Sequence, residues 1–234
     1  MIKTVMLDLD GTLLPLFQED FVKAYFGLLC KKLAPLGYQP EETVKAVWAG
    51  SKGMAQNDGS RKNSDIFWEI FRARLGALPE AKEYCDEFYK NEFDGVKAVL
   101  KYQTSRRAQI DRLKAAGLRL VLATNPVFPA DAFATRLKWV GLDYSDFDHV
   151  TNYENSSFCK PNPAYYKEIM AKLSLDPSEC LMIGNNATED MAAAKAGISV
   201  FLVPEFLENP DNIDCAAFRQ GTLDEAVDYA LQNT

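Results

Sequence analysis

The chain has 234 residues, of which 47% are hydrophobic and 25% charged, and its formal net charge is -7 at pH 7. A chain of this composition can bury a sizeable core, either as one large domain or as a core with a smaller subdomain. The acidic balance argues against a general nucleic-acid surface, which needs a basic face, although a few local cations could still bind a small anionic substrate.

The cysteine and hydropathy patterns bear on the location of the protein. Five cysteines are scattered along the chain, and because none forms a Cys-x-x-Cys pair, we expect reduced thiols rather than disulfides or a zinc site. No apolar run approaches the roughly 18 residues that a membrane helix needs, and no secretory signal pattern precedes the first predicted strand. We therefore expect a cytoplasmic protein that binds neither a membrane nor nucleic acid.

The first predicted element is a buried strand over residues 2–8, which ends in two carboxylates. Because alternate residues of an extended backbone point to the same side, Asp8 and Asp10 should share one crevice at the carboxyl end of this strand. Two carboxylates in one crevice need a proton or a cation between them, and Mg²⁺ with phosphate oxygens would satisfy both. The alternative is a simple turn, since Asp-Gly is also a common turn signal.

The next 80 residues contain no convincing strand. Helical patterns with an apolar stripe predict helices over residues 18–36, 41–50, 63–75 and 80–92. A Gly-rich, polar and locally basic loop is expected over residues 50–63 between the second and third helices. The segment is either an all-helical insertion or a set of extra helices in one domain.

Strands and helices alternate from about residue 105 onward. Further buried strands are predicted over residues 118–124, 180–184 and 198–203, and helices over residues 105–116, 163–173, 187–196 and 223–232. Continuous apolarity along the strands is typical of a parallel sheet that is covered on both faces. The alternation therefore predicts an α/β fold with a doubly wound parallel sheet.

Polar residues follow the later strands at their carboxyl ends. Thr124 and Asn125 could hydrogen-bond a phosphoryl group, and Lys160 could neutralise a carboxylate–phosphate cluster. The candidate metal ligands, or residues that support the ligands, are Asn185, Asn186, Glu189 and Asp190. Each also has an ordinary explanation as a loop start, a surface lysine or a helix-capping residue. Their order at successive strand ends is what favours a shared site.

This set of residues resembles the motifs of the haloacid dehalogenase superfamily of aspartate-nucleophile phosphohydrolases. The first motif of that family, Asp-x-Asp-Gly-Thr, is present over residues 8–12. Thr124 matches the second motif and Lys160 the third. The fourth motif has Asn185 where the family usually has an aspartate, followed by Asp190. The resemblance spans the whole chain.

The resemblance implies a role for each matching residue. Asp8 would be the nucleophile that forms an aspartyl-phosphate, and Asp10 would be the general acid for the leaving alcohol and then the base for water. Thr124, Asn125 and Lys160 would hold the transferring phosphoryl group.

The resemblance also implies a Mg²⁺ cofactor. Asp8, Asp10 through its backbone carbonyl, Asn185 and Asp190 are its expected ligands, but Asn185 brings no negative charge. The fourth-motif ligand is therefore left open between Asn185, Asn186 and Asp190.

Further contacts with the substrate are expected from two segments. Gly11 and Thr12 of the first motif join Asn125 as phosphate-binding residues. Lys52 and Arg61 of the expected 50–63 loop could contact a second anionic group of the substrate, or they could belong to a solvated basic loop.

Together these features predict a Mg²⁺-dependent phosphohydrolase for a small phosphorylated metabolite. The catalytic core would comprise residues 1–15 and 96–234, and residues 16–95 would form a helical cap. A phosphomutase of the same fold and a non-catalytic phosphatase-like binding protein are the alternatives. A 2-haloacid dehalogenase is disfavoured because those enzymes lack an aspartate at the position of Asp10. The oligomeric state, monomer or dimer, is left open.

Overall fold

A parallel sheet lies at the centre of the fold, which the computed structural model describes over residues 1–76 and 80–234. Residues 77–79, inside the expected 16–95 insertion, lie outside the described residues. The described residues form a five-stranded sheet in the order β3-β2-β1-β4-β5, with every pair parallel. The strands are β1 (Thr4–Leu7), β2 (Arg119–Leu122), β3 (His149–Val150), β4 (Cys180–Gly184) and β5 (Ser199–Leu202). The expected α/β fold with a doubly wound sheet is confirmed.

The strand order places β1 in the middle of the sheet. Thr4 of β1 is paired with Arg119 of β2 on one side and with Cys180 of β4 on the other. The chain adds β2 and β3 on one side of β1 and then crosses over to add β4 and β5, so the order reverses at β1. Ligands of open α/β sheets bind at such a reversal, beyond the carboxyl ends of the strands.

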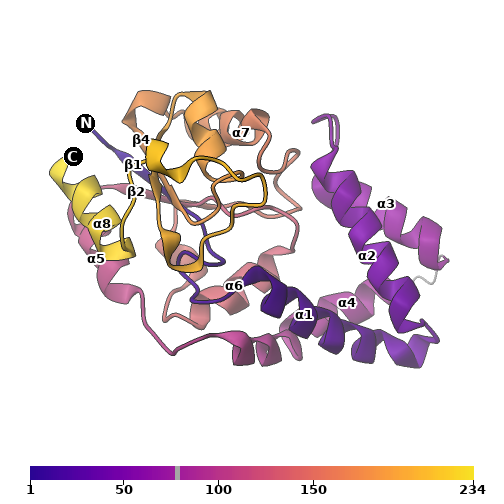
Figure 1. Ribbon diagram of the computed structural model, residues 1–234. Helices are drawn as coiled ribbons and strands as arrows, with labels where there is room; N and C mark the ends of the chain where they lie inside the picture. The colour runs from indigo at the N-terminus through magenta and orange to yellow at the C-terminus, as the bar shows by residue number, and fades with distance from the viewer. Residues whose placement is uncertain (77–79) are drawn as a thin grey trace.

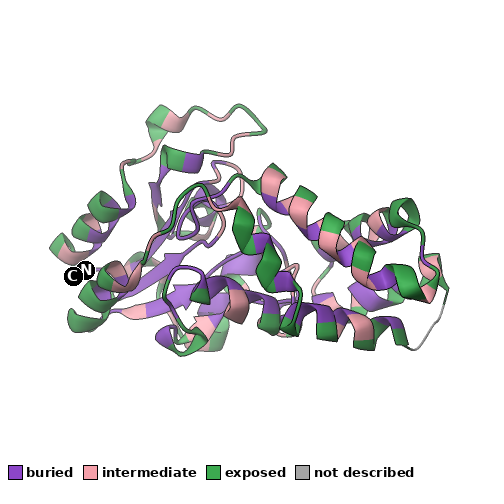
Figure 2. Cartoon of the chain, turned by 90° about the horizontal axis from the view of Figure 1, so that it is seen from below, coloured by how far each residue is buried: buried purple, intermediate pink, exposed green. Residues whose placement is uncertain are grey.

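Helices cover both faces of the sheet (Figure 1). They are α5 (Arg107–Ala115), α6 (Ala130–Lys138), α7 (Pro163–Leu173) and α8 (Leu223–Gln232). Successive residues of β1 alternate between the faces: Val5 and Leu7 pack with α5, α6 and α8, whereas Met6 packs with α7. All residues of β1 and β4 and most residues of the other strands are therefore buried (purple in Figure 2).

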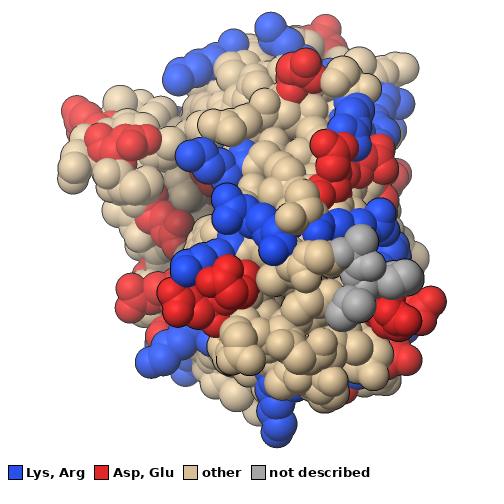
Figure 3. Space-filling model, turned by 90° about the vertical axis from the view of Figure 1, so that its right-hand side faces the viewer, with Lys and Arg blue, Asp and Glu red and all other residues tan. Residues whose placement is uncertain are grey.

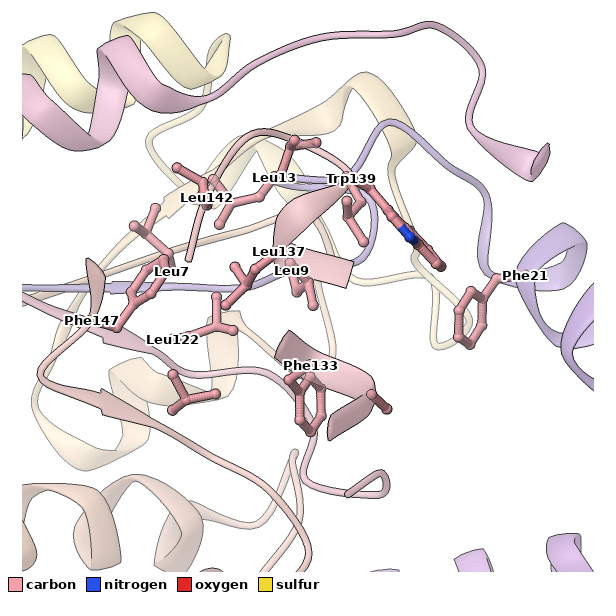
Figure 4. Close-up of a cluster of buried hydrophobic side chains, with 14 of the residues drawn as sticks. Leu7, Leu9, Leu13, Phe21, Leu122, Phe133, Leu137, Trp139, Leu142 and Phe147 are labelled. Carbon is pink, nitrogen blue, oxygen red and sulfur yellow. The ribbon is translucent and has the colours of Figure 1, made fainter. Parts of the chain in front are cut away.

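The helix α6 was not predicted from the sequence. Its residues Phe133 and Leu137, one turn apart, pack against Leu9 and Leu122 in the core below the first motif (Figure 4). This packing fixes the inner face of α6 beside the carboxyl end of β1.

Four helices and several short 3₁₀ helices complete the described residues. The helices are α1 (Gln18–Leu33), α2 (Pro40–Ala55), α3 (Asn63–Leu75) and α4 (Glu80–Lys90). The 3₁₀ helices are η1 (Ala34–Leu36), η2 (Phe93–Val99), η3 (Tyr144–Asp146), η4 (Pro177–Glu179), η5 (Met191–Ala196), η6 (Pro204–Phe206) and η7 (Cys215–Ala217).

Helices α1 to α4, here called the helical region, lie together at the end of the molecule opposite the two chain termini (Figure 1). Phe128, from the loop after β2, makes edge-on contacts with Phe21 and Tyr25 of α1, at centroid distances of 5.7 and 5.2 Å. This aromatic contact joins the helical region to the sheet at the carboxyl ends of the strands.

Two predicted elements differ in the structure. Much of the expected 50–63 loop is helical, because α2 continues to Ala55. A side chain at Gly50 or Gly53 would overlap Phe67 or Ile70 of α3, so these glycines allow α2 and α3 to pack closely rather than breaking the helix. The expected 187–196 helix is reduced to η5.

The start of the expected 187–196 helix is a tight turn instead. The Asn186 side-chain oxygen accepts hydrogen bonds from the backbone N–H groups of Thr188 and Glu189. This asparagine-capped turn replaces the first helical turn. Within the described residues, no helix combines the length and apolar character needed to cross a bilayer.

Candidate active site

The carboxyl ends of β1, β2 and β4 enclose a cavity of about 160 Å³, here called the small cavity. The sequence-predicted residues that line it are Asp8, Asp10, Thr124, Asn125, Asn185, Asn186, Glu189 and Asp190. Its other lining residues are Gln18, Val127, Phe128, Arg136 and Glu208. The structure thus brings residues from three of the four motifs into one cavity, and Lys160 of the third motif contacts two of its lining residues, Asp8 and Asp190.

Lys160 is the buried cation that joins two of these motifs. Its side chain is 0% exposed, and its Nζ lies 2.9 Å from Asp8 Oδ1 and 2.6 Å from Asp190 Oδ1. Burial alone would lower the pKa of Lys160, but the negative charges of Asp190 and Asp8 raise it well above its ordinary value. A permanent positive charge therefore lies beside Asp8.

Asp10 faces a second buried cation that the sequence analysis missed. Arg136 of α6 is 1% exposed, and its Nη1 lies 2.6 Å from Asp10 Oδ2. The guanidinium lies between the rings of Phe21, Phe128 and Phe133, at 5.1, 4.9 and 4.5 Å from their centroids. These rings fix the guanidinium and so fix one oxygen of Asp10, while Asp10 Oδ1 is buried without a hydrogen-bond partner.

Burial and charge set the protonation of Asp10. Burial raises the pKa of Asp10, the charge of Arg136 opposes this rise, and the charge of Asp8 adds to it. The net result is a raised pKa, so Asp10 holds a proton more readily than an exposed aspartate.

Asn185 is oriented by two hydrogen bonds. Its Oδ1 accepts from the Thr12 hydroxyl at 3.1 Å, and its Nδ2 donates to the Phe206 carbonyl at 2.7 Å. Gly11 has a φ of +79°, and a side chain there would overlap the Asn185 amide. Gly11 and Thr12, expected to bind phosphate, are absent from the described lining of the small cavity and hold Asn185 in place instead. An aspartate at position 185 would set a carboxylate against the Phe206 carbonyl, whereas an amide donates to it.

Glu189 and Asn125 form a second polar pair at the cavity. Asn125 Nδ2 donates to both carboxylate oxygens of Glu189 at 3.0 Å. Burial raises the pKa of Glu189 to about 8, although Lys160 opposes this rise. Asn125 Oδ1 is buried without a hydrogen-bond partner, so only its amide nitrogen is used in the structure.

Glu208 is a further carboxylate that the sequence analysis missed. It follows β5, and its backbone N–H donates to the Asn185 carbonyl at 3.1 Å, while Asn186 Nδ2 donates to its side chain at 3.3 Å. Burial raises the pKa of Glu208, and the charges of Asp8 and Asp10 raise it further. No sequence motif predicts Glu208 as a site residue, because it reaches the cavity only through a contact between the loops after β4 and β5.

The small cavity has the donor set that Mg²⁺ prefers. Five carboxyl groups from its described residues face only two cations, Arg136 and Lys160. Such a surplus of buried negative charge favours a bound proton or a further cation. The side chains offer mainly carboxylate and amide oxygens, and one buried carboxylate oxygen, Asp10 Oδ1, lacks a partner. These donors fit Mg²⁺, although no three acidic, His or Cys side chains of the described residues are already gathered as a metal cluster.

A second cavity, here called the large cavity, adjoins the first. It has a volume of about 500 Å³ and lies between α1, α2 and α3 and the strand ends. Lys52 lines it, from α2 rather than from a loop. Arg61 does not line either cavity and pairs with Glu69 at 2.7 Å. The remaining described lining residues are Gln18, Val22, Tyr25, Phe26, Leu29, Val47, Trp48, Ser51, Ala55, Phe67, Trp68, Phe71, Cys85, Tyr89, Asn125, Val127, Phe128, Tyr153, Lys160, Pro161 and Glu189.

Comparisons with a protein-family model and with known proteins point to the same family. The model of the haloacid dehalogenase-like hydrolases matches residues 2–197. A phosphoglycolate phosphatase of Nitrosospira multiformis is 29% identical to the chain, over 92% of the chain and 90% of that relative.

Solved structures of low sequence identity share the fold. A phosphatase of Thermococcus onnurineus has a TM-score of 0.60 at 19% identity, covering 97% of each chain. A 2-haloacid dehalogenase of Pseudomonas syringae has a TM-score of 0.65 at 20% identity, covering 100% of this chain and 99% of the other. At these sequence identities, the two structural similarities support a shared fold and no shared function.

Proposed function

The chain belongs to the haloacid dehalogenase-like hydrolases and is a phosphatase of that family, and we propose that it hydrolyses a phosphomonoester through an aspartyl-phosphate on Asp8, with Mg²⁺ as cofactor. One observation carries the proposal. Asp8 lies at the carboxyl end of the central strand, with its carboxylate 2.9 Å from a buried lysine and in one cavity with Asp10.

In the first step an Asp8 oxygen attacks phosphorus. The bond between phosphorus and the leaving oxygen breaks as the bond to Asp8 forms, and the departing alcohol takes a proton from Asp10. The raised pKa of Asp10 supports this role as acid.

In the second step water hydrolyses the aspartyl-phosphate. Asp10, now a carboxylate, removes a proton from the water as it attacks phosphorus. The bond to Asp8 breaks, and inorganic phosphate leaves with Asp8 restored. The same carboxyl group thus donates a proton in one step and accepts one in the next.

Positive charge and hydrogen bonds hold the phosphoryl group through both steps. The ammonium of Lys160 beside Asp8 would neutralise the phosphoryl oxygens, and Thr124 and Asn125 would donate hydrogen bonds to them. Asp190 positions Lys160 through the contact at 2.6 Å.

Mg²⁺ would be held by the carboxylate and amide oxygens of the small cavity. The candidate side-chain ligands are Asp8, Asn185, Asp190 and Glu208, and Asp10 would contribute its backbone carbonyl, which leaves its carboxyl group free for proton transfer. When bound, the ion supplies positive charge that stabilises the phosphoryl oxygens in the transition state.

We further propose that residues 16–95 act as a cap over the core of residues 1–15 and 96–234. The large cavity supports this division, because its walls come from the helical region and its floor from the strand ends. We also place the protein in the cytoplasm, since Cys30, Cys85, Cys159, Cys180 and Cys215 are unpaired thiols in the structure.

The test is release of inorganic phosphate from p-nitrophenyl phosphate, with Mg²⁺ and with EDTA. Asp8→Asn should lower kcat by roughly a thousandfold or more, because the amide is a poor nucleophile. Asp228→Asn, an exposed residue of α8, is the matched control and should retain full activity. Wild-type turnover by Asp8→Asn would refute the proposal, and transfer of phosphate to a second hydroxyl instead of release would indicate a phosphomutase.

A further inference from the structure

The large cavity continues from the small cavity. Gln18, Asn125, Val127, Phe128 and Glu189 line both. A phosphoryl group beside Asp8 would therefore direct its leaving group into the large cavity. The volume of about 500 Å³ lies within the usual range for sites that enclose a small molecule.

Aromatic rings contribute nine of the 22 described residues that line the large cavity. They come from separate elements: Phe26 from α1, Trp48 from α2, Phe67 and Trp68 from α3, and Phe128 from the core loop. Phe67 and Trp68 meet edge to face with centroids 5.3 Å apart, and Phe26 lies 5.7 Å from Trp48. Rings in this arrangement contact flat or branched apolar groups over a large area.

Two of the hydroxyl groups on the wall are hydrogen-bonded to each other. Tyr25 and Tyr89 both line the large cavity, and their hydroxyls are hydrogen-bonded at 2.9 Å. Burial raises the pKa of both phenols, so neither provides a charge. The tyrosines therefore add apolar ring surface.

Charge is scarce on the wall that the helical region provides. Among its described residues, Lys52 is the charged side chain that lines the large cavity, and Arg61 is paired with Glu69 elsewhere. On the outer surface of this end of the molecule, Lys and Arg are interspersed with Asp and Glu (Figure 3). Neither the cavity wall of the helical region nor this outer surface gathers the cluster of cations that would bind a second anionic group on a small phosphorylated substrate.

We propose that the substrates of this phosphatase are phosphomonoesters of aryl-bearing alcohols, with the aromatic part of the leaving group seated in the large cavity. This inference rests on the proposed function and adds the chemical class of the leaving group. Burial of an aromatic ring removes a large apolar area from water, whereas a short leaving group would leave the ring-lined wall exposed to it. A carboxylate in place of the ring would meet one cation from the helical region, Lys52, because Lys160 of the core already contacts Asp8 and Asp190.

The experiment compares two esters whose leaving alcohols have similar acidity, 2-phenylethyl phosphate and ethyl phosphate. We expect kcat/KM to be at least about tenfold higher for the phenylethyl ester. Binding of the corresponding non-hydrolysable phosphonates to the full chain with Mg²⁺ is measured by calorimetry and should show a similar ratio of Kd values. Tryptophan fluorescence gives a second readout, because Trp48 and Trp68 line the cavity and Trp139 does not.

A variant pair tests whether the large cavity is responsible. Trp48 is 53% exposed, so its replacement should be tolerated, and Trp48→Ala should reduce the preference for the phenylethyl ester by about threefold or more. Tyr144 is an exposed aromatic residue that lines neither cavity. Tyr144→Ala should therefore keep the wild-type preference.

The outcomes separate this inference from the function on which it rests. Hydrolysis of both esters with equal kcat/KM, or equal affinity for the two phosphonates, would overturn the aryl assignment alone. Tight binding of the phenylethyl phosphonate without hydrolysis of any ester would overturn the phosphatase function, and the substrate assignment with it. If the wild type prefers the phenylethyl ester and Trp48→Ala shows the same preference, the large cavity is not the cause of that preference.

Discussion

The two carboxylates of residues 8–12 contact different cations, and this difference suits their proposed roles. Asp8 contacts Lys160, which also holds Asp190, whereas Asp10 contacts Arg136. Burial raises the pKa of Asp10 despite the opposing charge of Arg136. A carboxyl group with a raised pKa carries a proton for the leaving alcohol more readily.

Arg136 should act by positioning Asp10. Arg136→Met is expected to lower kcat by about tenfold to a hundredfold with little change in KM, because Asp10 loses the partner that fixes its orientation. Arg136→Lys keeps a cation and should restore part of the rate. Steady-state kinetics on folded variants measures both, with Arg112→Met at the surface as control. A wild-type kcat for Arg136→Met would rule out the positioning role.

Glycine at position 184 should be required for activity, because the Asp190 carboxylate lies against it. A side chain at this position would overlap the Asp190 carboxylate and displace it from Lys160. Gly184→Ala is therefore expected to lower kcat/KM at least tenfold. Gly27→Ala is the matched control. Among the described residues, no atom beyond its own stretch of α1 lies within 4 Å of a Cβ added there, and the change should stabilise the helix by about 0.5–1 kcal/mol. Full activity of Gly184→Ala would mean that the contact between Asp190 and Lys160 is dispensable.

Glu208 should contribute to metal affinity, since it supplies negative charge beside the neutral Asn185. Glu208→Gln keeps the size of the side chain and is expected to weaken Mg²⁺ binding about tenfold, as measured by calorimetry without substrate. Glu205→Gln, three residues earlier and exposed, should bind Mg²⁺ like the wild type. Equal affinity in both variants would exclude Glu208 from the metal site.

At the scale of elements, Asp146 links η3 to α5. Its carboxylate contacts Arg107 at 2.6 Å and Lys114 at 3.2 Å. The hydrogen bond from Arg107 lowers the pKa of Asp146 from 3.8 to about 2, against the effect of burial and with further help from the Asp143 backbone and Lys114. A carboxylate with a depressed pKa stabilises the fold above its ordinary pKa, and this stabilisation is lost as the pH falls through the folded value.

Asp146→Asn should reveal this pH dependence. We expect the variant to lose about 1–2 kcal/mol of unfolding free energy at pH 7, since both cationic partners are partly exposed and screened by solvent. The difference from the wild type should be constant down to about pH 4 and shrink as the pH falls further toward 2. Denaturant unfolding at several pH values measures it, and a difference independent of pH would exclude the ion pair as the cause.

Capping signals made the bounds of two helices predictable from the sequence, whereas the uncapped α6 was not predicted at all. The bounds of α7 and α8 are as expected, because Asn162 caps one and Thr222 with Glu225 forms a capping box at the other. The short α6 offers only a Pro-Ala-Asp start and an apolar pair, Phe133 and Leu137, as signals. Such a weak pattern becomes a helix through packing against the core.

The glycines of α2 led to the wrong prediction of a loop where the chain is helical. Gly50 and Gly53 suggest a loop by local propensity, but close packing with α3 requires small residues at these positions. The close packing of α2 against α3 cannot be inferred from the sequence of α2 alone.

At the scale of the whole molecule, the order of the motifs predicted where the site would form. In a parallel sheet the carboxyl ends of the strands meet at one edge, so Asp8, Thr124 and Asp190 converge, and Lys160 joins them, although they are far apart in the chain. The large cavity could not be predicted, since its rings come from the four helices α1 to α4 and from core loops, whose relative placement is a product of the fold.

The central claim is that Asp8 carries the phosphoryl group during turnover. The most direct measurement is to quench the protein in acid while it hydrolyses substrate with Mg²⁺, reduce it with borohydride and locate the modified residue by peptide mass spectrometry. An aspartyl-phosphate is reduced to homoserine, so the expected result is homoserine at position 8, present only with substrate and absent from Asp8→Asn. Steady turnover with residue 8 unmodified, or modification of Asp10 in its place, would contradict the account.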